Sequence, residues 1–226
     1  MRAARTLIVV VLVVLVLAVV ADRAANAWAE REVGNRLAEA AGTEGRPAVS
    51  IEGFPFLTQV LAGEIGAATA TAEAAQLEGV RLRDLDARAA GVGLTSPVTV
   101  ESLELVGTLP EDELQRLVDE AGLGLAVATG PDGLSLSGEL LGQTVEVGTT
   151  PVVERGEVGL AVETVELAGL TVDPGRVAPL LGMPELMVDI DLPALPYGLR
   201  ITDAVPGEGG VRVTASGADV ILEEAG

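Results

Sequence analysis

Carboxylates are the only side chains in this sequence whose type and number could support enzymatic chemistry. Asp and Glu account for 34 of the 226 residues, all 14 basic residues are Arg, and there is no His, Cys or Lys. The sequence therefore excludes Ser-His-Asp and Cys-His catalysis, Schiff-base chemistry and the common zinc sites. What remains is hydrolysis by paired acids or the binding of a hard cation such as Ca²⁺.

Two pairs of aspartates have the spacing that such chemistry needs. Asp84 and Asp86, and likewise Asp189 and Asp191, are two residues apart, so each pair shares one face of a strand. Either pair could flank a sugar. Acidic residues are so frequent here that close pairs arise by chance, and only four aromatic residues are present to stack on sugars. We therefore favour solvated acidic faces and expect no catalytic residues, no metal and no cofactor.

The net charge of −20 limits the partners of the chain. An acidic surface repels phosphate backbones, so we expect no nucleic-acid binding. It also gives no general attraction to anionic lipid.

The N-terminus carries an export or anchoring segment. Arg2 and Arg5 precede the uncharged run Leu7–Ala21, a pattern typical of a signal peptide or of an N-terminal transmembrane anchor. Small residues at 25–27 would suit a signal peptidase. In either case the rest of the chain lies outside the cytoplasm, in the cell envelope or periplasm.

Residues 22–45 have the pattern of an amphipathic helix. Ala29, Val33 and Leu37 recur at helical spacing, with charged residues between them. We expect this apolar stripe to pack along a sheet. The alternative is a stalk that lifts the domain off the membrane.

Residues 46–226 alternate in the manner of antiparallel strands, with one irregularity that recurs. The apolar positions keep a period of two, skip one residue and resume at Arg83-Asp84, at Glu101-Ser102 and at Glu163-Thr164. A β-bulge absorbs such a slip and bends the strand, so we predict a highly curved, bulged sheet. Loops between short strands are the alternative. With the long helix, the predicted class is α+β.

Two short helices interrupt the strands. Thr108-Leu109-Pro110-Glu111 is typical of a capping box with proline in the first turn, and this predicts a helix that ends at Gly122. Asp173-Pro174 starts a second, shorter helix.

The aromatic residues lie beside prolines in two separate segments. Phe54 and Phe56 flank Pro55, and Tyr197 follows Pro196. Proline stiffens the backbone and removes a ladder donor, so these rings occupy fixed positions outside regular strands. They either plug the core or line the mouth of a groove, and Phe54 and Phe56 need not share one role.

Several short sequence segments, which occur in the same order along the chain, resemble the LmeA-like phospholipid-binding family of actinobacterial cell envelopes. They are GFPFLTQ at 53–59, ADR at 21–23, AEREV at 29–33, LRDLD at 82–86 and LPALPYGLR at 192–200. The resemblance implies an exported, non-enzymatic phospholipid binder connected with lipoglycan (mannan) assembly. It also implies a fold similar to tubular lipid-binding domains of the bactericidal/permeability-increasing type, a long helix on a curved sheet around an apolar groove. Tyr197 stands where that family commonly has Phe.

These observations combine into one prediction and two alternatives. Residues 1–21 form the signal or anchor, 22–45 the helix, and 46–226 a curved-sheet domain that binds phospholipid acyl chains. The residues predicted to line or gate the groove are Phe54, Phe56, Leu57, Val60, Leu61, Leu195, Tyr197 and Leu199, with Arg200 at its rim. The alternatives are a carboxylate-dependent glycan-processing enzyme and a structural envelope protein with a filled core.

Overall fold

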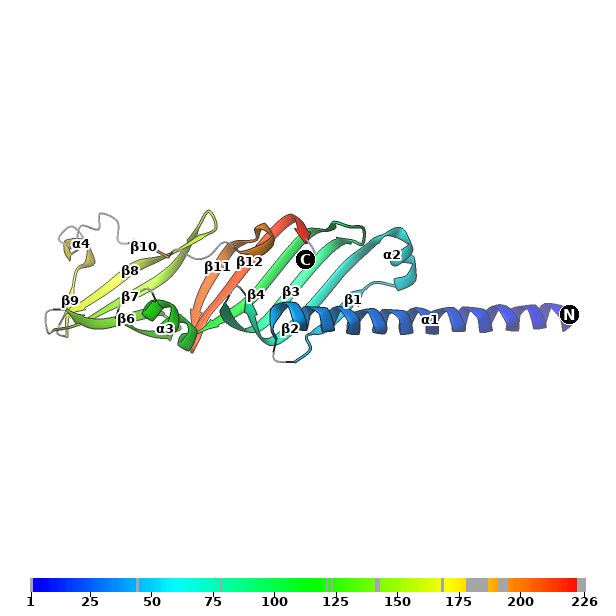
Figure 1. The fold of residues 1–226 in the computed structure, drawn as a ribbon, viewed down its shortest axis with the longest axis horizontal. Helices are drawn as coiled ribbons and strands as arrows, with labels where there is room; N and C mark the ends of the chain where they lie inside the picture. Colours follow the sequence, from blue (N-terminus) through cyan, green and yellow to red (C-terminus); the bar gives the residue numbers. More distant parts are fainter. Residues whose placement is uncertain are drawn as a thin grey trace.

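The chain folds into one long helix and two antiparallel sheets that follow one another along an elongated molecule (Figure 1). The computed structural model describes all residues except 1, 44, 78, 121, 123, 141–142, 168, 178–186, 191–194 and 223–226.

Helix α1 (Arg2–Ala41) is continuous over 40 residues. It runs beside the first sheet and then projects well beyond it toward the N-terminus (Figure 1). Residues 8–21 are exposed, and Asp22, which follows them, is buried. By length and composition, α1 contains a helix that could cross a membrane, as the sequence predicts.

The first sheet, sheet A, has six strands. In spatial order they are β1 (Ala48–Glu52), β2 (Glu64–Leu77), β3 (Val80–Gly93), β4 (Val98–Pro110), β12 (Gly210–Leu222) and β11 (Arg200–Gly207). Helix α2 (Phe56–Ala62) joins β1 to β2, and a 3-10 turn, η2 (Pro196–Gly198), precedes β11.

The second sheet, sheet B, is formed by the chain between β4 and β11. In spatial order its strands are β10 (Met187–Ile190), β8 (Glu157–Leu167), β7 (Gln143–Glu154), β6 (Gly133–Leu140) and β5 (Ala126–Gly130), with β9 (Leu170–Val172) paired to β8. Helices α3 (Glu111–Glu120) and α4 (Pro174–Val177) lie at the starts that the sequence predicts. The continuation of α4 lies outside the described residues.

The predicted α+β class, with a long helix and bulged antiparallel strands, is confirmed. The strands are divided between two open sheets where a single curved sheet is predicted. This arises because the strands between residues 126 and 190 pair only with one another, and the chain returns to sheet A at β11.

Two of the three predicted bulges are confirmed. The pairing of β3 with β4 shifts between Arg83 and Asp86. In β8, Glu163 is an extra residue, because Gly148 pairs with Thr164 and Thr149 with Val162. The prediction at Glu101-Ser102 is wrong, since β4 keeps its register with both neighbouring strands there.

The start of α3 differs from the predicted capping box. Thr108 belongs to β4, where it pairs with Arg212 of β12, and Pro110 ends that strand. The Glu111 carboxylate instead accepts hydrogen bonds from the backbone N–H and the hydroxyl of Thr129, at 2.7 and 2.9 Å. The motif thus marks the helix start correctly, but the side chain of Glu111 binds a neighbouring strand.

Glu113 connects α3 to sheet A and is fully buried. Its carboxylate accepts hydrogen bonds from the Arg81 backbone N–H at 3.2 Å and from Arg116 Nε at 3.0 Å. The Arg116 bond lowers the pKa of Glu113 and outweighs burial, which acts in the opposite direction; the Arg81 N–H adds to the lowering.

We expect Glu113 to make the fold acid-sensitive. A carboxyl whose pKa is lowered in the folded state stabilises the fold above its unfolded pKa of about 4.3. That contribution disappears as the pH falls through the folded-state pKa. Glu113→Gln should cost about 1–3 kcal/mol at pH 7 and much less at pH 3. Thermal unfolding of both proteins across this range checks it, and an equal penalty at both pH values would contradict the assignment.

Candidate functional site

One face of sheet A is apolar from edge to edge. Residues that pair directly in antiparallel strands point to the same face. One row crosses all six strands and contains only aliphatic side chains: Val49, Ala70, Ala87, Leu105, Ala215 and Ile201. A second row, across five strands, is Ile51, Ala68, Ala89, Leu103 and Gly217. We call this surface the apolar face.

The opposite face of sheet A is polar. The row next to these consists of Ser50, Thr69, Arg88, Glu104, Ser216 and Arg200. Arg88 and Glu104, which are paired in the register, form an ion pair at 3.1 Å. Sheet A therefore separates an apolar side from a solvated side, as a sheet does when one face binds an apolar layer.

The apolar face is only partly covered. Leu103, Leu105, Ala87 and Ala89 in its centre are half-buried, whereas in a filled two-layer domain they would be buried. The accessible surface of the chain is 14570 Å², against about 9,600 Å² for a compact chain of this mass.

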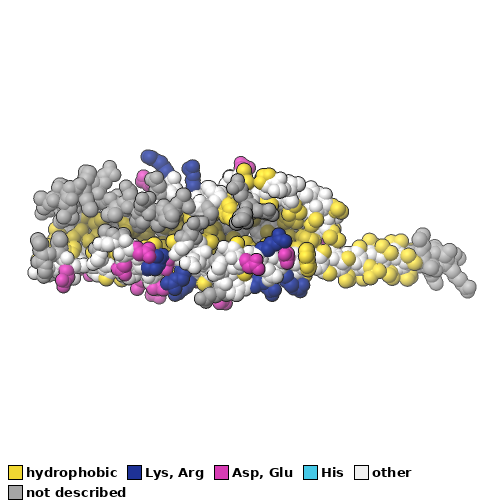
Figure 2. Space-filling model, in the orientation of Figure 1, with side chains coloured by type: hydrophobic (Ala, Val, Ile, Leu, Met, Phe, Trp, Pro, Cys, Tyr) yellow, Lys and Arg dark blue, Asp and Glu magenta, His cyan; other side chains and the backbone are white. Residues whose placement is uncertain are grey.

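Sheet B continues the apolar face. Its row Val127, Leu136, Val147, Val165 and Val172 is again wholly apolar. A core cluster joins the two sheets, with Val127 and Leu134 from sheet B packed with Ala204 and Val211 from sheet A. Figure 2 shows hydrophobic side chains along much of the molecule, recessed between more polar margins. The two apolar faces therefore form one long surface.

The predicted aromatic segment divides into a buried and an exposed part. Phe56 is 6% exposed, and Phe54 is 60% exposed with the Arg23 guanidinium 5.0 Å from its ring. Leu57, Val60 and Leu61 on α2 are all exposed. Phe54 and Phe56 thus have the different environments that the sequence interpretation allows.

The second predicted segment lies elsewhere on sheet A. Leu199 is 7% exposed and packs in a core cluster with Val100 and Val220, with Leu195 partly buried beside it. Tyr197 is half exposed, at a left-handed φ of 58°.

Sheet A separates the two predicted segments. Helix α2 contacts α1 and β2, whereas η2 contacts β12, so β3 and β4 lie between them. A row of Ile65, Val92, Val100 and Val220, buried except for the half-buried Val92, links the two on the apolar side. Arg200 lies in the polar row, on the other face of sheet A.

Helix α1 docks through a polar seam that the apolar stripe does not predict. The side facing the domain carries Asp22, Asn26, Glu30 and Gly34, four residues apart, while Val33 and Leu37 are exposed. Asp22 Oδ1 accepts a hydrogen bond from the Leu57 backbone N–H at 2.8 Å. Glu30 Oε1 accepts one from the Ile51 backbone N–H at 3.0 Å and one from Asn26. The sequence signal is the recurrence of polar and small residues at i, i+4.

Gly34 lets α1 approach the sheet closely, and we predict that Gly34→Ala destabilises the fold. A Cβ there would lie 2.9 Å from the Pro47 carbonyl oxygen. In a free helix this change stabilises by about 1 kcal/mol, whereas here the helix must shift, at a cost of about 1–3 kcal/mol. Urea unfolding checks the sign, and a more stable variant would contradict the packing.

The paired aspartates do not form a catalytic arrangement in the described residues. Asp84 is exposed at a left-handed φ of 51°, and Asp86 pairs with Arg88 at 3.0 Å. Asp191 and the side chain of Asp189 lie outside the described residues.

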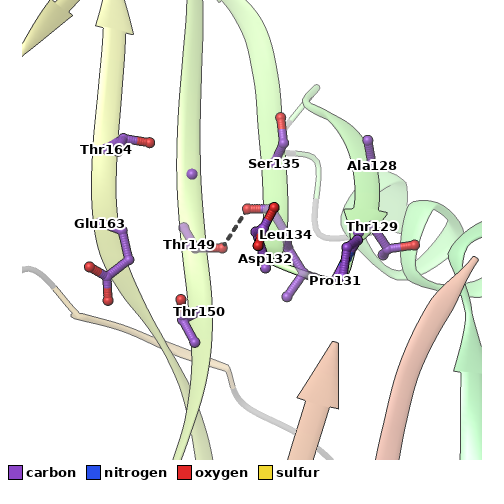
Figure 3. A pocket seen from close by; sticks show the side chains of 13 residues that line it. Ala128, Thr129, Pro131, Asp132, Leu134, Ser135, Thr149, Thr150, Glu163 and Thr164 are labelled. Carbon is purple, nitrogen blue, oxygen red and sulfur yellow. Dashed lines mark hydrogen bonds between the residues drawn. The ribbon is translucent and has the colours of Figure 1, made fainter. Parts of the chain in front are cut away.

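Two open cavities lie beside the two confirmed bulges. One, of about 580 Å³, adjoins Asp84. The other, of about 410 Å³, adjoins Glu163 and is shown in Figure 3, where Thr149 donates to the Leu134 carbonyl oxygen at 3.3 Å. The first cavity is also lined by residues 45–48 after α1, and the second by residues 128–135 of β5 and β6 with the turn between them.

An α+β domain with a long, half-buried apolar face and an apolar helix at one end has a surface suited to contact with an apolar ligand or phase. The LmeA-like phospholipid-binding family matches residues 20–216, nearly the whole chain beyond the projecting helix. The chain is a member of that family. Searches of curated proteins and of solved structures return no match.

Proposed function

We propose that this protein binds the acyl chains of phospholipids on the apolar face, without catalysing a reaction. The observation that carries the proposal is the pair of aliphatic rows through Leu103 and Leu105, which are only half-buried, in a chain of a phospholipid-binding family. The small side chains of β2 and β3 in these rows leave space above the sheet, and the leucines of β4 offer contact surface.

Burial of hydrocarbon supplies the affinity. Each methylene removed from water contributes about 0.8 kcal/mol, so ten contribute about 8 kcal/mol before the costs of association. Only the part of this free energy that exceeds those costs appears as affinity. No charge attraction is needed, in agreement with the net charge of −20.

The two predicted groove segments have different roles in this proposal. Leu195 and Leu199 extend the apolar face above β12, with Tyr197 at its margin. Phe54, Leu57, Val60 and Leu61 lie outside the two aliphatic rows, at the end of sheet A from which α1 projects, and do not hold the acyl chains. Phe56 holds α2 in place, and Arg200 serves the solvated side.

The protein acts outside the cytoplasm and keeps its N-terminal helix as an anchor. Cleavage after Ala27 would remove Asp22 and Asn26, which are buried in the seam between α1 and the domain. The loss of the bond from Leu57 to Asp22 would leave a backbone donor without its partner. Support of lipoglycan (mannan) assembly in the cell envelope is the role that family membership suggests.

Native mass spectrometry of the full chain, extracted in a mild detergent because α1 is kept as an anchor, tests the proposal. We expect a mass increment equal to one or more phospholipids, lost on activation and restored after incubation with vesicles. A clean mass of the protein alone, with no uptake from vesicles, would contradict lipid binding. A structural protein whose apolar face is filled by its own side chains would also give this negative result.

A further inference from the structure

Helix α2 and the loop before it carry an exposed apolar surface that the groove does not use. Phe54 is 60% exposed, Leu57 40%, Val60 41% and Leu61 87%. Helix α2 has no acidic residue in its first turn and no basic residue in its last. Large apolar side chains gathered in this way on a surface mark a contact with another apolar phase.

This surface is fixed to the base of the projecting helix. Leu57 donates its backbone N–H to Asp22 at 2.8 Å, and the Arg23 guanidinium lies over the Phe54 ring. In Figure 1, α2 lies at the end of sheet A from which the N-terminal part of α1 extends. In Figure 2, hydrophobic side chains cover that end of the domain and continue along the helix.

The length of the uncharged run in α1, and the charged residue that ends it, determine where along the helix the bilayer surface lies. The uncharged run Thr6–Ala21 rises about 24 Å, which is close to the thickness of a hydrocarbon core of about 30 Å. Asp22 is the first charged residue after the run and is costly to place in hydrocarbon. The surface of the bilayer therefore lies at Asp22, which is also the level of Leu57.

We propose that α2 and its preceding loop form a membrane-docking element that inserts Phe54, Leu57, Val60 and Leu61 into the interface of the bilayer in which α1 is anchored. Such an element lies in the plane of the headgroups and binds through its apolar side chains. An acidic domain has no electrostatic means of holding itself against lipid, so apolar insertion has to do so. Docking would hold this end of the apolar face against the membrane.

Site-directed spin labelling tests this proposal directly, because the chain has no native cysteine. Leu61→Cys carries the nitroxide on α2. Leu170→Cys is the matched control, since Leu170 is also an exposed leucine, 72% accessible, at the sheet B end of the molecule. The full chain is reconstituted into phosphatidylcholine–phosphatidylglycerol vesicles, and collisions with oxygen and with a water-soluble nickel chelate are measured.

We expect the label at 61 to collide with the nickel chelate about tenfold less often than the label at 170, and more often with oxygen. Equal nickel accessibility at both positions would overturn the proposal. Protection at 61 that persists without lipid would also overturn it, because a protein contact would then cover α2.

A second variant separates docking from lipid binding on the apolar face. Leu61→Asp alters a residue that is almost fully exposed, so the fold should be unaffected. We expect it to restore nickel accessibility of a label at Val60→Cys, while the lipid mass retained in native mass spectrometry stays the same. A label still protected in the Leu61→Asp variant would count against insertion of this helix. If the unsubstituted chain carried no bound lipid, the acyl-chain site on the apolar face would be refuted, but membrane docking by α2 would not.

Discussion

Replacing Leu105 by Asp is expected to reduce the phospholipid retained by the protein at least tenfold. Leu105 lies in the centre of the row that crosses all six strands of sheet A, and it is only half-buried. A carboxylate in contact with acyl chains loses its hydration without gaining a partner, and every 1.4 kcal/mol of that penalty is a factor of ten in affinity. Lipid phosphorus per mole of purified protein is the measurement.

Ser102→Asp is the matched control for this prediction. Ser102 is exposed on the same strand, and it lies two residues from Glu104 and so on the polar face. It adds the same charge, and we expect it to leave the lipid content unchanged. Equal loss in both variants would show that added negative charge, rather than the apolar face, governs binding. Circular dichroism verifies that each variant is folded.

Replacing Phe56 by Ala is expected to cost about 3–5 kcal/mol of unfolding free energy. Phe56 is buried where α2 meets the rest of the domain, and removing the ring leaves a cavity. Phe54→Ala should cost about 0.5–1 kcal/mol, the value of an exposed cation–π contact with Arg23.

Urea unfolding of the two variants under the same conditions measures the difference. The account requires Phe56→Ala to unfold at a much lower urea concentration than Phe54→Ala. Similar costs for both would contradict the separation of a structural ring from an exposed one. Membrane docking, in contrast, should weaken in Phe54→Ala.

The strand irregularities could be predicted from the sequence because they disturb the hydrophobic period. The slips at Arg83-Asp84 and Glu163-Thr164 correspond to extra residues in the pairing. The slip at Glu101 does not, since residues on the two neighbouring strands opposite it, Gly91 and Asp219, adopt left-handed φ values and keep all three strands in step. The sequence of β4 by itself cannot show that the neighbouring strands change backbone conformation at the same level.

The docking of α1 was predicted on the wrong side of the helix. Ala29, Val33 and Leu37 form an apolar stripe, but the contacts to the domain are made by Asp22 and Glu30. Both carboxylates accept hydrogen bonds from backbone N–H groups, whose positions depend on tertiary structure rather than on residue type. Hydrophobic periodicity therefore contains no information about this seam.

The apolar face could be predicted only in part. Alternation indicates which residues of each strand point inward, but the division into two sheets and the rows across them depend on pairing between distant segments. The aromatic motifs led to Phe54 and Leu199, which lie at the margins of the face. Its centre is built from alanines and leucines that form no recognisable motif.

Photo-crosslinking with a phospholipid that carries a diazirine in its acyl chain identifies the residues that contact acyl chains. The full chain in vesicles of this lipid is irradiated and digested, and the labelled residues are identified by mass spectrometry. The account predicts labels on the apolar face, at Ala87, Ala89, Leu103 and Leu105, in addition to the anchor in α1. Labels confined to α1 and α2, with none on β3 or β4, would contradict it.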